Sequence, residues 1–359
     1  MLEILNGPAA NAGRGNHGMA LQAGRVLYDT RVKLARLFGV SNPNDIALTS
    51  NATSALNLAI KGWLKPGDHV VATTVEHNSV RRPLEFLKRT LGIQVDYAEV
   101  DRQGQLDLRR VEKLFNPRTR LLVCSHSSNL LGCILPIPEL SRMAHAFGAV
   151  ILVDAAQTAG CYPVNVQEME IDLLAFPGHK GLLGPQGTGG LYIRPDIDLE
   201  PLLHGGTGSQ SEESEQPFVR PDRYEAGTAN TPGMAGLGVG VETVLERGVE
   251  QIHRREWGLT QYLMKELQSV PGIRLIGPDI GQPRTGIVSF TIDGQDASEV
   301  AFRLDREYGI AVRAGYHCTP LGHQTAGTLQ GGAVRASVGY LTTEAELQVL
   351  IHAILTMFK

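Results

Sequence analysis

The chain has 359 residues, more than one hydrophobic core usually holds, so we expect two domains. Its 42% hydrophobic and 19% charged residues are typical of a soluble globular protein, and a net charge of −4 gives no electrostatic reason to expect a nucleic-acid or membrane partner. There is no apolar run of about 18 residues, no signal-peptide pattern and no CxxC pairing among the four cysteines. We therefore expect a cytoplasmic protein.

Helical patterns alternate with short apolar runs from residue 20 to about residue 195. The runs HVVATT, IQVDYAEV, RLLVCS, AVILVD and DLLAF have the length and composition of strands that are buried on both faces. This alternation predicts an α/β fold with a mostly parallel sheet flanked by helices. Residues 286–359 alternate again and predict a smaller C-terminal α/β domain. We place the large domain at residues 13–245 and the small domain at residues 246–359.

Two stretches near the boundary between the predicted domains differ in character from the alternating regions. Residues 204–233 are polar and rich in Gly and Pro, and a loop of that length is usually functional or disordered. One long helical region is predicted to follow, from about Ala235 to Ser269.

Polar side chains follow the predicted parallel strands at the points where they end. His77, Asn129, Asp154 with Gln157, and His179 with Lys180 stand after four of these strands. Ligands of open parallel sheets bind at the carboxyl ends of strands. A carboxylate, amide donors, an imidazole and an amine suit a flat aromatic cofactor with a ring nitrogen, a phenolic oxygen and an aldehyde. A surface lysine on a tight loop is the simpler interpretation of Lys180 alone. A Walker-type phosphate loop fits poorly, because Lys180 precedes most of the glycines.

A phosphate group on such a cofactor requires free backbone N–H groups. The segment TSNATSALNLAI places Asn51, Ala52 and Thr53 at a predicted helix start, where free amides and the helix dipole favour an anion. An ordinary N-cap explains the same residues without a ligand.

Cys318 differs from the other three cysteines, which lie in or beside apolar segments and read as buried hydrophobic residues. It follows a glycine turn, His317 adjoins it and Pro320 comes soon after. Basic neighbours favour a thiolate. A zinc site of His317, Cys318 and His323 is an alternative with no evident fourth ligand.

The ordered motifs SNATSALN, VEHNS, HSSNLLG, VDAAQ, GHKGLLGPQGTGGLY, EAGTANT, VRAGYHCTPLG and VRASVGY run from about Gly13 to the C-terminus. They resemble the class V aminotransferase group of fold-type I pyridoxal-phosphate enzymes. Within that group they are similar to the group II cysteine desulfurases and selenocysteine lyases, which carry a short RAGYHC-like loop.

The resemblance implies roles for the residues at the strand ends. Lys180 would bind the aldehyde of pyridoxal 5′-phosphate covalently, and Asp154 would pair with the ring nitrogen. Gln157 and Asn129 would bind the phenolic oxygen, and His77 would stack on the ring and serve in proton transfer. The phosphate would be held by Ala52, Thr53 and His179. In the family a threonine of the neighbouring subunit also reaches it, and Thr228 corresponds to that threonine. A homodimer follows from this last role.

The resemblance also implies the reaction. Cys318 would take sulfur from L-cysteine as a persulfide and release L-alanine, and L-selenocysteine is a further expected substrate. Arg335 would clamp the substrate carboxylate, with Arg313 as a second arginine and Asn129 as a further contact. A sulfur-accepting protein is the expected partner, and its pathway, such as iron–sulfur cluster assembly, stays open.

Three features depart from the family pattern. The family has an extended N-terminal segment that helps to cover the substrate before this chain's first helix. We interpret residues 1–12 as a truncated remnant of it, with a misassigned start as the alternative, and expect weaker substrate binding or poor solubility. Pro177 replaces a serine and removes a phosphate donor, and Tyr316 replaces a histidine. Two other functions stay open: a class V aminotransferase, lyase or epimerase without sulfur chemistry, and an inactive cofactor-fold binding protein.

Overall fold

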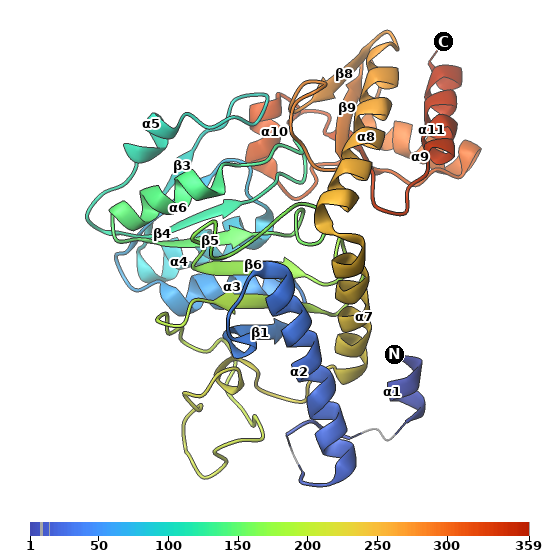
Figure 1. The fold of residues 1–359 in the computed structure, drawn as a ribbon. Helices are drawn as coiled ribbons and strands as arrows, with labels where there is room; N and C mark the ends of the chain where they lie inside the picture. Colours follow the sequence, from blue (N-terminus) through green and yellow to red (C-terminus); the bar gives the residue numbers. More distant parts are fainter. Residues whose placement is uncertain (8–9, 14, 359) are drawn as a thin grey trace.

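The computed structural model describes residues 1–7, 10–13 and 15–358 (Figure 1). Neighbouring strands from β6 to β3 of its larger sheet are parallel, whereas β7 runs antiparallel to both β6 and β1. The predicted mostly parallel sheet is therefore confirmed. Its spatial order is β1 (Ile46–Thr49), β7 (Gly189–Ile193), β6 (Leu173–Pro177), β5 (Val150–Asp154), β4 (Thr119–Ser125), β2 (His69–Thr73) and β3 (Gln94–Ala98).

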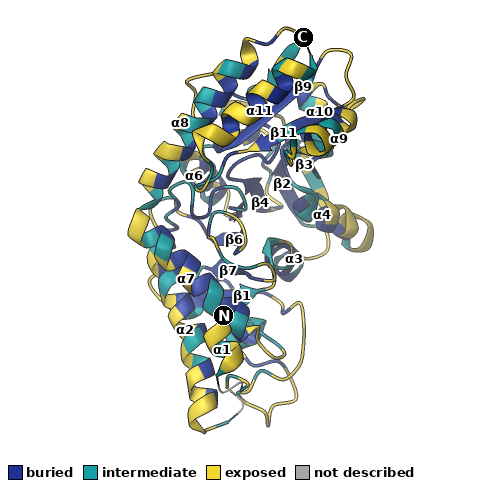
Figure 2. Ribbon diagram, turned by 90° about the vertical axis from the view of Figure 1, so that its right-hand side faces the viewer, coloured by how far each residue is buried: buried dark blue, intermediate teal, exposed yellow. Residues whose placement is uncertain are grey.

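Helices cover both faces of this sheet. Successive side chains of a strand point to opposite sides, so a strand of consecutive apolar residues has an apolar surface on each face that a helix must cover. In β5, Ile151 and Val153 pack into one hydrophobic cluster, and Val150 and Leu152 pack into another. Figure 2 shows the buried strands between helices whose outer sides are exposed. The first cluster includes α2 (Gly18–Phe38), α5 (Leu108–Glu112), α6 (Ile137–Ala146) and α7 (Thr231–Arg247), and the second includes α3 (Ala52–Trp63) and α4 (Asn78–Leu91).

A smaller antiparallel sheet follows towards the C-terminus, as the sequence predicts for its α/β tail. Its four strands lie in the order β10 (Arg313–Gly315), β11 (Ala333–Ser337), β9 (Ile287–Ile292) and β8 (Ile273–Ile276). Apolar residues of this sheet form a third cluster with α8 (Val249–Gln268), α9 (Ala297–Tyr308) and α11 (Glu344–Met357). The short α10 (Pro320–Ala326) leads towards β11.

The helical region predicted from Ala235 to Ser269 is two helices. Helix α7 begins earlier, at Thr231, and Gly248 separates α7 from α8. The φ of Gly248 is +80°, a left-handed conformation that ends a helix and that glycine adopts most readily.

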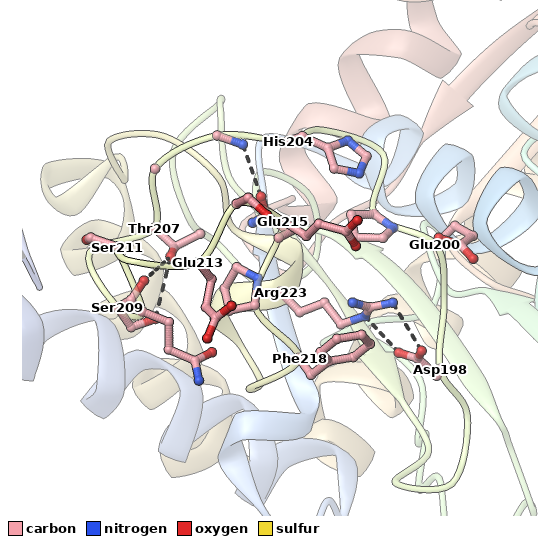
Figure 3. A pocket seen from close by; sticks show the side chains of 17 residues that line it. Asp198, Glu200, His204, Thr207, Ser209, Ser211, Glu213, Glu215, Phe218 and Arg223 are labelled. Carbon is pink, nitrogen blue, oxygen red and sulfur yellow. Dashed lines mark hydrogen bonds and ion pairs between the residues drawn. The ribbon is translucent and has the colours of Figure 1, made fainter.

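The polar segment 204–233 contains only a 3₁₀ turn at Asp222–Tyr224 before α7 begins. Its residues enclose a polar pocket of about 810 Å³, on whose wall the guanidinium of Arg223 bonds Asp198 at 2.8 Å and lies 4.6 Å from the ring centroid of Phe218 (Figure 3). None of the predicted site residues lines this pocket.

The N-terminal helix α1 (Leu2–Asn6) has contacts with α7. Among the residues that the structure describes, no helix combines the length and apolar character that crossing a membrane requires.

Candidate active site

The carboxyl ends of β2, β4, β5 and β6 meet at one edge of the larger sheet, where a cavity of about 200 Å³ lies. The structure brings eight of the predicted site residues together on the wall of this cavity. They are Ala52, Thr53, His77, Asn129, Asp154, Gln157, His179 and Lys180.

Lys180 and Asp154 form the electrostatic centre of the cavity. Lys180 is exposed at the cavity surface, yet protein walls surround it, and burial lowers the pKa of its amine. Asp154 opposes that lowering, whereas Arg335 and Arg313 add to it. Burial raises the pKa of Asp154, and the N–H of Ala156, 2.9 Å from its Oδ1, lowers it, as does Lys180. The pair offers an amine of reduced basicity close to a desolvated carboxylate.

The loop that carries Lys180 is fixed by glycine. The N–H of Gly178 donates to the carbonyl of Thr188 at 2.8 Å, and a Cβ at Gly178 would lie 2.1 Å from Oγ1 of Thr188. Only glycine therefore fits at this close approach. Pro177 ends β6 and lines the cavity, so this departure from the family pattern lies directly at the site.

The start of α3 faces the same cavity. Asn51 is the N-cap, and its Oδ1 accepts the N–H of Ser54 at 2.9 Å. The N–H groups of Ala52 and Thr53 belong to the first turn, where a helix offers no acceptor for them. They are available to an anion, and the positive end of the helix dipole favours one.

His77 caps the start of α4 and is held in one orientation. Its Nδ1 accepts the N–H of Ser79 at 3.0 Å. Burial, together with the smaller effects of the charges of Lys180, Arg313 and Arg82, lowers the pKa of His77 to about 4. The imidazole is therefore neutral at pH 7, which suits stacking against a flat ring.

Cys318 lies on a loop with two consecutive left-handed residues, since the φ of His317 is +47° and that of Cys318 is +62°. Such backbone persists only where the surroundings hold it. The carbonyl of Cys318 accepts the N–H of Asn78 at 2.8 Å, and the carbonyl of His317 accepts a bond from Nδ2 of Asn129. The hydroxyl of Thr319 donates to the carbonyl of Val75 at 3.3 Å. The loop that carries Cys318 is thus tied to the edge of the larger sheet.

The basic neighbour of the Cys318 thiol is Arg313, whose Nη2 lies 3.2 Å from Sγ. His317 does not supply charge to this sulfur. Its imidazole is buried with Nε2 bonded to the carbonyl of Ala333, and burial lowers its pKa to about 4. His323 bonds Thr328 instead. The described ranges contain no group of three or more metal-ligating His, Cys, Asp or Glu side chains, so the zinc alternative has no ligand set there.

Arg335 lines a second cavity, of about 410 Å³, which shares Ala156, Gln157 and Lys180 with the first. Its Nη1 donates to the carbonyl of Asn129 at 2.9 Å, and its buried Nε has no hydrogen-bond partner among the described residues. Burial lowers the pKa of Arg335 to about 10. A desolvated guanidinium with a free N–H is suited to a carboxylate ligand.

Thr228 lies away from both cavities, exposed beside a pocket that α1 residues also line.

Other side chains of the first cavity were not predicted. Ser125 ends the run RLLVCS and Ser127 follows it, so the reasoning that selected Asn129 applies to them as well. Ser79 follows His77 and shares a hydrogen bond with Thr53 at 2.7 Å. The role of Asn78 rests on its backbone N–H, which no sequence pattern reveals.

The family model of the class V aminotransferases matches residues 1–350. The chain belongs to this family. A probable cysteine desulfurase of Methanothermobacter thermautotrophicus is 38% identical over 357 residues, which cover 98% of this chain and 88% of that protein. The apo structure of the cysteine desulfurase from Thermococcus onnurineus superposes with a TM-score of 0.93 at 34% identity, covering 99% of this chain and 89% of the other.

Another similar solved structure contains a cofactor. The structure of a C-DES variant, in which glycine is covalently linked to the PLP cofactor, matches at a TM-score of 0.84 and 25% identity and covers 100% of this chain and 90% of that chain.

The side chains at the cavity of this class V family member fit a pyridoxal phosphate, as the residues themselves indicate. Asp154 is a buried carboxylate suited to a protonated ring nitrogen, and Oδ1 of Asn129 is buried without a partner among the described residues. Free amides at the start of α3 suit a phosphate, and Lys180 reaches the cavity between them.

Proposed function

We propose that this chain is a pyridoxal-phosphate-dependent cysteine desulfurase, which converts L-cysteine to L-alanine and keeps the sulfur as a persulfide on Cys318. The observation that supports it most is the placement of Cys318. Its loop accepts hydrogen bonds from Asn129, which lines the cavity that contains Lys180, and from Asn78, which adjoins the cavity-lining His77. Arg313 contacts its sulfur. The cysteine desulfurases among the relatives support the same reaction.

We propose that eight residues of this chain and one of a neighbouring subunit hold the cofactor. Lys180 would bind its aldehyde, Asp154 its ring nitrogen, and Gln157 with Asn129 its phenolic oxygen. His77 would stack on the ring, while Ala52, Thr53 and His179 would hold the phosphate. When bound, pyridoxal phosphate withdraws electrons from the substrate bonds at Cα. Thr228, remote from this chain's own cavity, would complete the phosphate site of a second copy in a homodimer.

The side chains of this chain carry the substrate steps. Arg335, assisted by Arg313 and Asn129, would bind the substrate carboxylate through a forked pair of hydrogen bonds. The amine of Lys180, with its lowered pKa, is suited to take a proton from Cα and to return one near neutral pH.

Sulfur transfer would take place at Sγ of Cys318. Its thiolate forms an S–S bond to the substrate sulfur as the C–S bond breaks. The electron pair of that C–S bond stays with the carbon fragment, which gains a proton and leaves as L-alanine. Selenium has the same bonding geometry, so L-selenocysteine would react in the same way. A thiol-bearing acceptor protein in the cytoplasm would then receive the persulfide sulfur.

The proposal is tested by the mass of the protein after reaction with L-cysteine. The chain, loaded with pyridoxal phosphate and exposed to L-cysteine without reductant, should gain one sulfur atom on the peptide that contains Cys318. Cys161→Ser is the matched control, because Cys161 lines the adjoining cavity, and this variant should gain the sulfur as well. Sulfur on Cys161 with none on Cys318 would contradict the proposal. A loaded chain that transaminates other amino acids and forms no persulfide would favour the alternative without sulfur chemistry.

A further inference from the structure

A second buried carboxylate lies behind the cavity. Glu76 follows β2 and precedes His77, and only 2% of its surface is exposed. Its Oε1 accepts the N–H of Ser125 at 2.9 Å and the hydroxyl of Thr73, and its Oε2 accepts the hydroxyl of Ser125 at 2.9 Å. The carboxylate therefore joins the ends of β2 and β4.

These hydrogen bonds connect Glu76 to Asp154. Ser125, which lines the cavity, pairs in register with Asp154 on the neighbouring parallel strand. The N–H of His126 donates to the carbonyl of Asp154 at 2.9 Å. Glu76 and Asp154 are close enough that the charge of Asp154 raises the pKa of Glu76.

Uncharged donors bind Glu76, and within residues 1–7, 10–13 and 15–358 no Lys, Arg or His forms an ion pair with it. Its charge also reaches Cys124 on β4 and Tyr97 on β3, which are neutral or anionic. Burial raises the pKa of Glu76 to about 7, against the lowering effect of its hydrogen bonds to Thr73 and Ser125. A buried carboxylate without a cation is costly, and a nearby cationic ligand would offset that cost.

We propose that Glu76 is a positioning residue of the cofactor site. It holds Ser125 at the cavity wall and places a second negative charge behind Asp154, which favours a proton on the ring nitrogen that Asp154 faces. This inference rests on the proposed function, because it requires bound pyridoxal phosphate. The ring withdraws electrons effectively only with that proton in place. Glu76 acts through Asp154 and need not touch the cofactor.

Glutamine separates the charge of Glu76 from its hydrogen bonds. In Glu76→Gln the side-chain oxygen still accepts from Ser125 and the negative charge is lost, whereas Glu76→Ala loses both. A purely structural role predicts that the glutamine variant behaves as the wild type and that the alanine variant alone is altered. A charge role predicts equal changes in both variants.

The first measurement is the pH dependence of the nitrogen NMR signal of the ring nitrogen of bound, isotope-labelled pyridoxal phosphate, without substrate. We expect the midpoint to move to lower pH by about one unit, a tenfold loss of proton affinity, in both Glu76→Gln and Glu76→Ala. A glutamine variant that binds pyridoxal phosphate and titrates as the wild type would overturn the role of Glu76 alone. A wild-type chain that binds no pyridoxal phosphate would overturn the proposed function and this inference with it.

The second measurement needs no cofactor. Because the pKa of Glu76 is raised in the folded state, its contribution to stability is complete below about pH 4.5 and is lost as the pH rises through about 7. The melting temperature of cofactor-free Glu76→Gln, relative to the wild type, should therefore increase between these pH values. A difference that stays constant with pH would show that the pKa of Glu76 is the same in the folded and unfolded states, so that Glu76 is not coupled to the charge of Asp154, and would overturn the inference.

Discussion

Arg313 and Arg335 lie directly opposite each other on the antiparallel strands β10 and β11. Like charges at such a position are destabilising, and the charge of Arg313 adds to the burial that lowers the pKa of Arg335. Within the described part of the chain, their side-chain partners are Sγ of Cys318 and the carbonyl of Asn129, and neither arginine pairs with a carboxylate. The two guanidinium groups therefore form a site suited to an anion beside Cys318.

Replacement of Arg335 should weaken the reaction with L-cysteine more than replacement of Arg313. Arg335→Lys keeps the charge and loses the fork, and we expect a loss of about 2–4 kcal/mol, roughly 30- to 900-fold in kcat/KM. The exposed Arg313, changed to lysine, should cost less, because water screens it. Steady-state alanine formation measures both, with the absorption of bound cofactor as the control for folding. Equal losses in the two variants would argue against Arg335 as the main clamp.

Asn129 should govern how firmly the Cys318 loop is held. In cofactor-free Asn129→Ala the carbonyl of His317 loses its hydrogen-bond donor. The closed state of the loop then loses about 1 kcal/mol of stabilisation, so the loop should open roughly fivefold more often. The alkylation rate of Cys318, followed by peptide mass spectrometry, reports this opening. Asn116→Ala is the matched control, because Asn116 caps a turn of the chain before β4. Unchanged alkylation in Asn129→Ala would show that the other two anchors suffice.

Glu225 should anchor the segment that carries Thr228. Its carboxylate forms a largely buried ion pair with Arg31 of α2 and accepts the N–H of Leu48 at 2.6 Å. Glu225→Ala leaves Arg31 unpaired in the interior, so we expect a loss of about 3–5 kcal/mol in the free energy of unfolding. Urea denaturation measures it. For comparison, Glu200→Ala, in a pair exposed on both sides, should cost under about 1 kcal/mol.

Glu256 should make the protein less stable as the pH rises. Burial raises the pKa of this cavity-lining carboxyl to about 8. Since the folded value lies above the unfolded value of 4.5, its contribution to stability is complete below pH 4.5 and is lost as the pH rises through 8. Glu256→Gln removes this dependence. The melting temperature of the variant, relative to that of the wild type, should therefore increase from about pH 5 to about pH 8.5, which roughly span the two pKa values. A melting temperature of Glu256→Gln that stays constant or falls relative to that of the wild type over this range would contradict the assignment.

The sequence predicts the parallel part of the sheet well, because strands buried on both faces appear as short apolar runs and their carboxyl ends mark the cavity. Strand β7 was missed for a physical reason. Its first residues, Gly189 and Gly190, read as loop glycines, yet a Cβ there would lie 2.7 Å from the carbonyl of Phe176 and 2.5 Å from its ring. These glycines allow β7 to pack closely against Phe176 of β6.

Adjacent residues in the sequence also proved a poor guide to side-chain contacts. His317 precedes Cys318, but the left-handed turn directs its ring towards Ala333, and the cation at the sulfur is Arg313, five residues away. The hydrogen bonds from Asn78 and Asn129 to this loop depend on how the smaller sheet packs against the larger one, which no local pattern specifies. The division at residues 245 and 246 and the roles of the site residues stay predictions.

The most direct test of the central claim is alanine release from L-cysteine by the purified chain with reductant and pyridoxal phosphate present, compared with Cys318→Ser and Lys180→Ala. We expect the wild type to form alanine, Cys318→Ser to bind the cofactor without forming alanine, and Lys180→Ala to form none. Alanine release by Cys318→Ser at the wild-type rate would contradict the account, because the sulfur would then be taken by another group.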